Sequence, residues 1–81
     1  MTLKVISAEK ILFEGDVTAV TLPGTMGSFT VLHNHASLIS ALTPGVIRYR
    51  NGGQAGDADG EIAVAGGVVD VDNNIVSVCV C

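Results

Sequence analysis

Alternation with a period of two residues is the feature that most constrains how this chain can fold. In residues 3–8, 17–22 and 75–81, the side chains at odd positions form one set and those at even positions form another, as in Leu3 and Val5 against Lys4. Successive side chains of a β-strand point to opposite faces of a sheet, so each of these segments is expected to be a strand with two unlike faces. The dominant pattern therefore predicts a chain built from strands.

Turn-forming residues interrupt the alternation at short intervals. Glycine supplies positive φ, proline fixes φ, and asparagine or aspartate caps its own turn. Turns are expected at 14–16, 23–24, 44–45, 51–53, 59–60, 66–67 and 72–74. The strands between them are predicted at about residues 2–8, 10–13, 16–22, 27–31, 36–42, 45–50, 61–65, 67–71 and 74–80. Many short strands with frequent turns predict an all-β sandwich or barrel.

Two segments have weaker signals. Residues 35–42 carry an apolar spacing that a short helix could also use, and Pro44 would end such a helix. Residues 52–60 are small, polar and rich in glycine, and we expect them to be the most mobile part of the chain.

The length of the chain and its low charge indicate one domain that uses partners. The 81 residues fit a single domain, residues 1–81, with a thin core. Charged residues make up 15% of the chain and hydrophobic residues 48%, against about 25% charged residues in ordinary domains. Small apolar residues scattered over the surface would account for this composition, but a permanent partner surface accounts for it better.

The charges argue against several partners. The net charge is −4, and Lys4, Lys10, Arg48 and Arg50 form no basic stripe, which disfavours nucleic acid and anionic lipid. The apolar runs are far shorter than about 20 residues, so no direct membrane insertion is expected. The segment 1–20 has too many charges for a secretory signal. An intracellular setting is predicted, because a disulfide between the closely spaced Cys79 and Cys81 would pinch the strand.

Candidate chemistry is weak. His33 and His35 could bind zinc together with Cys79 and Cys81, but one intervening residue in each pair is tighter than structural zinc sites use. A hydrolase would need Ser28, Ser37 or Ser40 beside one of the histidines, with Asp70 orienting the base, and no nucleophile elbow surrounds any serine. We therefore predict no catalytic residues, no metal site and no cofactor.

A longer arrangement of short motifs is more specific than any of these sites. The chain contains Ser7-Ala8-Glu9 and Phe13-Glu14-Gly15, then Pro23-Gly24-Thr25-Met26-Gly27, His35-Ala36-Ser37-Leu38, Pro44-Gly45, Gly66-Gly67 and a last segment that begins at Asn74. In this order and spacing the motifs resemble the N-terminal domain of the epsilon subunit of F-type ATP synthases, over essentially the whole chain.

The resemblance implies a fold and a role. The fold would be a β-sandwich of two roughly five-stranded sheets. The role would be that of a non-catalytic rotor subunit in the central stalk of a proton-translocating ATP synthase, peripheral at the cytoplasmic face of the cell inner membrane. Its partners would be the gamma subunit and the polar loops of the c-ring. By the family's motifs, Ser28, Phe29 and His35 are candidate c-ring contacts, and Leu38, Ile39 and Leu42 are weaker candidates for gamma.

The chain departs from the family pattern at three places. Ser37 stands where the family usually has proline, which leaves the chain there freer to bend or to donate a hydrogen bond. His33 replaces another usual proline. The chain stops at Cys81, where many relatives continue into two inhibitory helices, so neither inhibition of hydrolysis nor ATP binding is expected of it.

One alternative from another functional class stays open. A free-standing β-sandwich module could bind a peptide or a carbohydrate through an aromatic platform. Only Phe13, Phe29 and Tyr49 could supply such a platform, which weakens this alternative.

Overall fold

The alternating segments form nine strands in the computed structural model, which describes residues 1–50 and 59–80. The strands are β1 (Thr2–Ile6), β2 (Ile11–Asp16), β3 (Ala19–Gly24), β4 (Gly27–Leu32), β5 (Leu38–Leu42), β6 (Gly45–Arg50), β7 (Asp59–Val64), β8 (Gly67–Asp72) and β9 (Ile75–Val80). The nine predicted strands are confirmed, and the ambiguous segment 35–42 contains a strand. Most of segment 52–60, predicted to be mobile, lies outside the described residues.

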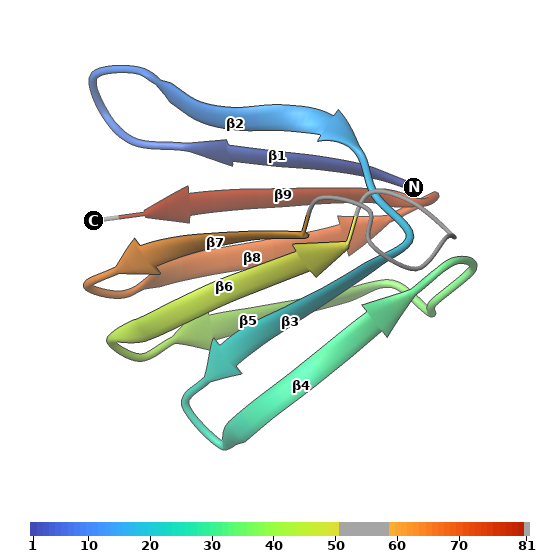
Figure 1. The fold of residues 1–81 in the computed structure, drawn as a ribbon. Helices are drawn as coiled ribbons and strands as arrows, with labels where there is room; N and C mark the ends of the chain where they lie inside the picture. The colour runs from blue at the N-terminus through green and yellow to red at the C-terminus, as the bar shows by residue number, and fades with distance from the viewer. Residues whose placement is uncertain (51–58, 81) are drawn as a thin grey trace.

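The strands lie in two layers that face each other (Figure 1). The five-stranded layer has the order β2-β1-β9-β8-β5, and the four-stranded layer has the order β4-β3-β6-β7. A single bridge between Gly24 of β3 and Leu42 of β5 joins the layers at one corner, so one curled sheet runs through both. The predicted two-layer β-sandwich is confirmed, with five strands in one layer and four in the other.

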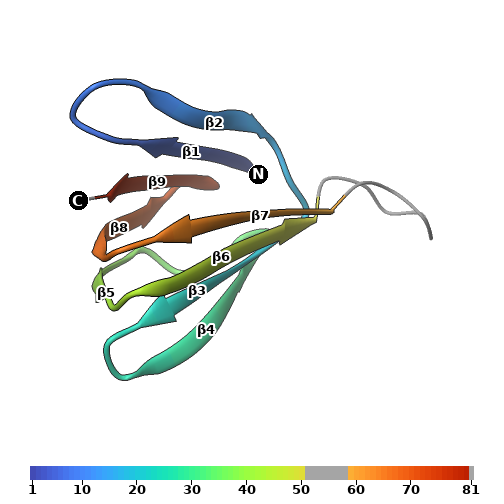
Figure 2. The ribbon, with the colours of Figure 1, turned by 60° about the vertical axis from the view of Figure 1, so that its left-hand side comes forward.

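The strand order places β2 and β4 on opposite sides of the molecule, as both ribbon views show (Figures 1 and 2). The views also show the turns gathered at two ends. The β1–β2, β3–β4, β5–β6 and β7–β8 connections lie at one end, and the β4–β5 and β8–β9 connections lie at the other. We call these the first end and the second end.

The inward side chains of both layers form one apolar core. Its buried members are mostly β-branched, which suits the pleated surface of a strand. They are Leu3, Val5, Val17, Val20, Leu22, Val31, Leu42, Ile47, Val64, Val69, Val71, Val76 and Val78. Burying one such side chain stabilises a fold by about 2 kcal/mol. The core is what holds the two layers as one body.

Two predicted turns, at 14–16 and 59–60, are wrong. Residues 59 and 60 pair with β6 as the first two residues of β7. Gly15 pairs with Leu3 inside β2, and β3 begins only at Ala19. The chain changes layers one step later: the Val17 amide donates to the Met1 carbonyl at 2.8 Å in the five-stranded layer, and the Thr18 amide donates to the Arg50 carbonyl at 2.7 Å in the four-stranded layer. Pairing with β1 overrides the local turn preference of glycine.

An aromatic contact closes one side of the sandwich between the layers. The rings of Phe13 on β2 and Tyr49 on β6 have their centroids 4.2 Å apart at an angle of 39°. Tyr49 also lies over Gly60, where a Cβ atom would collide with the tyrosine ring. The absence of a side chain at Gly60 is therefore what gives the Tyr49 ring its place.

Candidate partner-binding surfaces

The three candidate c-ring residues do not lie together. Ser28 and Phe29 stand at the start of β4, at the first end; Ser28 is exposed and Phe29 packs against the core. His35 lies in the β4–β5 connection, at the second end. The strand between Ser28 and Leu32 alone spans roughly 13 Å, four rises of about 3.3 Å. A contact with all three residues would have to run along β4, and their role stays a prediction.

The connection that holds His35 is well ordered by hydrogen bonds. The His35 amide donates to the Leu32 carbonyl at 3.1 Å. Nδ1 of His35 lies 2.7 Å from the Ala36 carbonyl oxygen, to which it donates in the tautomer that is protonated at Nδ1. The Ser37 hydroxyl donates to Oδ1 of Asp72 at 2.7 Å, a hydrogen bond that a proline at this position could not make.

Two asparagines link this connection to the β8–β9 turn. The Asn34 amide donates to Oδ1 of Asn74 at 2.6 Å, and Nδ2 of Asn74 donates to Oδ1 of Asn34 at 3.0 Å. Both residues have positive φ, 64° and 61°, which asparagine tolerates better than most residues. Turn signals in the sequence do not reveal this pair, because they indicate where the chain bends and not which two bends meet.

The candidate gamma residues differ in accessibility. Ile39 is 75% exposed, on the outer face of the five-stranded layer beside Asp70 of β8. Leu38 is half-buried and packs against the core, and Leu42 is only 6% exposed. Leu42 therefore serves the core, and Ile39 is the member of this set that a partner can reach.

The accessible candidates lie in a segment of the chain that has no charged residues. Residues 17–47, which contain β3, β4, β5 and the start of β6, include no Asp, Glu, Lys or Arg, and we call them the charge-free sector. Met26 at 99%, Ile39 at 75% and Leu32 at 56% exposure all belong to it. Depletion of charge is typical of the centre of a protein interface. Plotting charge along the chain would have revealed this sector from the sequence.

A row of apolar side chains crosses the outer face of the five-stranded layer. The register places Ile11 beside Ile6, Ile6 beside Cys79, Cys79 beside Val68, and Val68 beside Ala41. Ile11 and Val68 are about half exposed, and Cys79 is a free, exposed cysteine. No periodicity within one strand reveals such a row, because it depends on how five strands are aligned.

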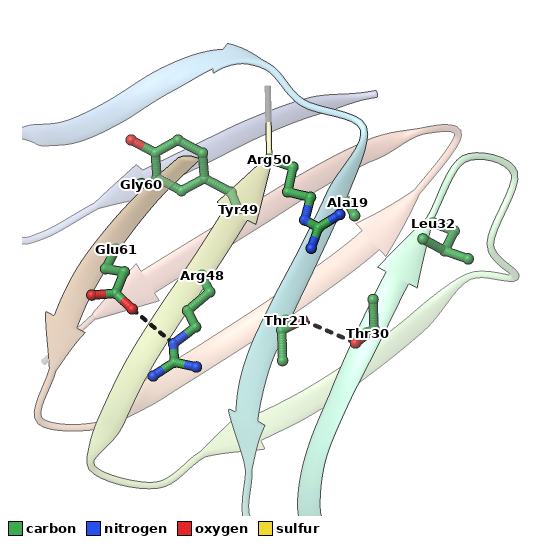
Figure 3. A pocket seen from close by; sticks show the side chains of 9 residues that line it. All are labelled: Ala19, Thr21, Thr30, Leu32, Arg48, Tyr49, Arg50, Gly60 and Glu61. Atoms are coloured by element: carbon green, nitrogen blue, oxygen red, sulfur yellow. Dashed lines mark hydrogen bonds and ion pairs between the residues drawn. The ribbon is translucent and has the colours of Figure 1, made fainter. Parts of the chain in front are cut away.

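The outer face of the four-stranded layer is hollowed. A depression of about 830 Å³ is lined by Ala19, Thr21, Thr30, Leu32, Arg48, Tyr49, Arg50, Gly60 and Glu61 (Figure 3). Nε of Arg48 lies 2.8 Å from Oε2 of Glu61, and the Thr21 and Thr30 hydroxyls are 2.9 Å apart. The ion pair is exposed, so it contributes little to stability. The polar side chains of this hollow mainly bond to one another.

The metal ligands weighed in the sequence do not come together. His33 and His35 lie near the β8–β9 turn, whereas Cys79 lies near the far end of β9, and Cys81 is outside the described residues. In residues 1–50 and 59–80 no three His, Cys, Asp or Glu side chains are grouped as metal ligands. No helix of the described chain is long and apolar enough to cross a membrane.

Sequence comparison finds relatives along the entire chain. Residues 1–81 match the family described as ATP synthase, Delta/Epsilon chain, beta-sandwich domain. An ATP synthase epsilon chain of Leptospira borgpetersenii is 40% identical over 78 residues, which are 96% of this chain and 58% of the relative. One from a Synechococcus species is 41% identical over 80 residues, 99% of this chain and 56% of the relative. The chain thus spans little more than half the length of these relatives.

Structural comparison supports the same fold. A chain in the cryo-EM structure of the Tetrahymena thermophila mitochondrial ATP synthase central stalk and c-ring superposes with a TM-score of 0.81 at 18% identity, over 99% of this chain and 62% of that one. A chain of the Euglena gracilis mitochondrial ATP synthase gives 0.83 at 20% identity, over 96% and 48%. With the family match over residues 1–81, this chain belongs to the ATP synthase delta/epsilon family, as its β-sandwich domain.

Proposed function

We propose that this chain is a non-catalytic rotor element of a proton-translocating ATP synthase, placed in the central stalk between the gamma subunit and the c-ring. There it would turn with both partners and help couple proton flow to ATP synthesis, at the cytoplasmic face of the membrane. The observation that carries the proposal is the family match over residues 1–81. The named epsilon chains among its relatives point the same way.

The build of the sandwich suits a part that transmits torque. A single close-packed core connects the two layers, and close-packed interiors deform little under load. The task needs standing contact surfaces more than a pocket. The charge-free sector and the apolar row provide two such surfaces on the described chain.

The alternative of a free-standing binding module is less well supported. Phe13 and Tyr49 pack on each other between the layers, and Phe29 packs against the core. None of the three rings is presented as an open platform, which ligand recognition by stacking would need.

The gamma contact is tested at Ile39. An Ile39→Asp substitution places a charge in the charge-free sector, and we expect it to weaken binding to purified gamma by at least about tenfold, since a desolvated, unpaired charge is costly. Ile75→Asp is the matched control, because Ile75 on β9 is also exposed but belongs to neither the charge-free sector nor the apolar row. Unchanged binding of both variants, or no binding of the wild-type chain at micromolar concentration, would contradict the proposal.

The c-ring contact is tested at its two separated candidates. Ser28→Ala and His35→Ala are assayed one at a time for association with the ring in detergent. If the ring contacts only one end of the sandwich, one of the two substitutions should weaken its association with the chain. If the ring contacts the full length of β4, both substitutions should weaken it. If neither substitution changes ring association, these residues are not ring contacts.

A further inference from the structure

The open edges of the sheet are not equally protected. Strands β2, β4 and β7 each have one neighbour among the described strands. Natural proteins guard such edges with charged side chains, proline or bulges, because unpaired N–H and C=O groups invite another strand. Edge β2 carries Glu14 and Asp16, and edge β7 carries Glu61. Edge β4, Gly27–Leu32, has neither charge nor proline.

The pairing of β4 with β3 fixes which of its backbone groups face outward. Pro23, opposite Ser28, has no N–H, and its carbonyl accepts from the Thr43 amide at 2.8 Å, on the side away from β4. Since bonded and non-bonded pairs alternate in an antiparallel ladder, Ser28 and Thr30 both occupy non-bonded positions. Their N–H and C=O groups therefore point out of the sheet edge, whereas those of Phe29 point to β3.

The side chains around this edge suit an uncharged neighbour. β4 lies in the middle of the charge-free sector. Large apolar side chains are exposed at both ends of this edge, Met26 in the turn before β4 and Leu32 at the end of β4. A segment laid along the β4 edge would therefore gain backbone hydrogen bonds and apolar contacts next to a strand that carries no charge, and the charges that share the hollow with Leu32 lie on β6 and β7.

We propose that β4 accepts an extended, uncharged segment of the gamma subunit as an added strand, an inference that rests on the stalk function proposed above. The acceptor site is the outward backbone of Ser28 and Thr30. The segment would continue past the β4–β5 connection towards Ile39, the accessible candidate for gamma. The Ser28 side chain, which points out of the sheet face, takes no part in this backbone pairing.

The size of the edge favours a flexible segment over a second copy of this chain. Two six-residue edges are about 20 Å long and about 10 Å wide, so pairing them buries on the order of 400 Å² in total. A stable association of two rigid bodies needs about 1,200 Å² or more. A segment of roughly eight residues reaches Met26 and Leu32 as well as the edge, because it can follow the twist of the sheet.

Residue-level hydrogen exchange of the full chain, free and with purified gamma from the same cells, tests the proposal. In the free chain the amides of Ser28 and Thr30 should exchange fast and those of Phe29 and Val31 slowly. On addition of gamma, the Ser28 and Thr30 amides should slow by at least about tenfold, as for amides that gain a hydrogen bond. Binding with Ser28 and Thr30 still exchanging fast overturns strand addition and leaves the stalk function standing.

Variants separate the backbone from the side chain. Thr30→Pro removes one outward N–H and should weaken gamma binding by at least about tenfold. Thr30→Val loses only the hydroxyl contact with Thr21 and should bind as wild type. Ala63→Pro is the matched control on edge β7. The backbone groups of Arg48 point to Thr21 of β3, so its partner Glu61 on β7 is in a non-bonded pair. Glu61 and, two residues on, Ala63 therefore point their backbone groups out of the sheet edge as well. Ala63→Pro should bind normally.

Each remaining outcome decides the matter. Equal loss in Thr30→Pro and Ala63→Pro, with both variants folded by circular dichroism, overturns the proposal. A dimer of the free chain by sedimentation that Thr30→Pro abolishes assigns the edge to a second copy, and overturns it too. If Thr30→Pro does not fold, the exchange measurement on the wild-type chain decides alone. No binding to gamma at micromolar concentration overturns both this inference and the stalk function.

Discussion

At the scale of single residues, the Asn34–Asn74 pair combines two sources of stability. Asn74 holds a positive φ and exchanges two hydrogen bonds with Asn34. Asn74→Ala loses both the bonds and the tolerance of that φ, and should lower the free energy of unfolding by about 2 kcal/mol. Asn74→Gly keeps the backbone freedom and should lose only about 1 kcal/mol. Urea denaturation measures both, and equal losses would mean that the backbone conformation contributes nothing.

Two glycines with positive φ differ in what surrounds them. Gly67, with φ 150°, would place a Cβ atom against the Cys79 carbonyl of the neighbouring strand, whereas Gly27, with φ 122°, has nothing within 4 Å of that position. Gly67→Ala should therefore destabilise by about 3 kcal/mol or more, since backbone must move, and Gly27→Ala by about 1 kcal/mol from its φ alone. Thermal unfolding of both variants checks the order. A larger loss at Gly27 would show that φ matters more than the collision.

At the scale of elements, the Phe13–Tyr49 contact ties edge strand β2 to the opposite layer. In a double-mutant cycle, Phe13→Leu and Tyr49→Leu should show a coupling of about 0.5–1.5 kcal/mol, which is typical of an aromatic pair. Phe13→Leu combined with Phe29→Leu is the control, because β2 and β4 lie on opposite sides of the molecule, and their effects should add within about 0.5 kcal/mol. Additivity in the first cycle would mean that the rings only fill space.

The sequence predicts where the strands lie better than it predicts how they align with one another. Period-two alternation identified three of the strands, as in Leu3 and Val5 against Lys4, and the turn residues between the strands located the other six. The motif order added the two-layer sandwich. The alignment of strands was beyond reach: nothing within β9 says that Cys79 lies between Ile6 and Val68, or that Asn34 meets Asn74. Such features depend on contacts between distant segments.

The candidate contact residues show the same difference between what the sequence predicts and what only the fold reveals. Their types came from matched motifs, but their accessibility came from the fold. Ile39 and Leu42 lie three residues apart on β5, yet one is exposed and the other belongs to the core. Odd separations on a strand place side chains on opposite faces, so the two could not serve one external contact together.

At the scale of the whole molecule, charge is divided along the chain. All Lys, Arg, Asp and Glu residues lie in segments 1–16 and 48–81, and the charge-free sector lies between them. The register puts Asp70 and Asp72 on the outer face of the five-stranded layer, and Arg48 and Arg50 on that of the four-stranded layer. A partner that binds along the β4 edge and reaches Ile39 would meet these charges only at the margin of the five-stranded layer, where Asp70 lies beside Ile39.

This distribution predicts how the proposed binding to gamma responds to salt. Contacts made by an uncharged surface are screened little, so the dissociation constant should change by less than about threefold between 50 and 500 mM sodium chloride. Sodium sulfate at equal ionic strength should tighten binding, since it strengthens apolar burial. The Ile39→Lys variant is the control, because its new charge should introduce a salt dependence that the wild-type chain lacks. A dissociation constant that rises tenfold or more with chloride would instead place gamma on one of the charged faces, and the β4 edge would lose its claim as the docking site.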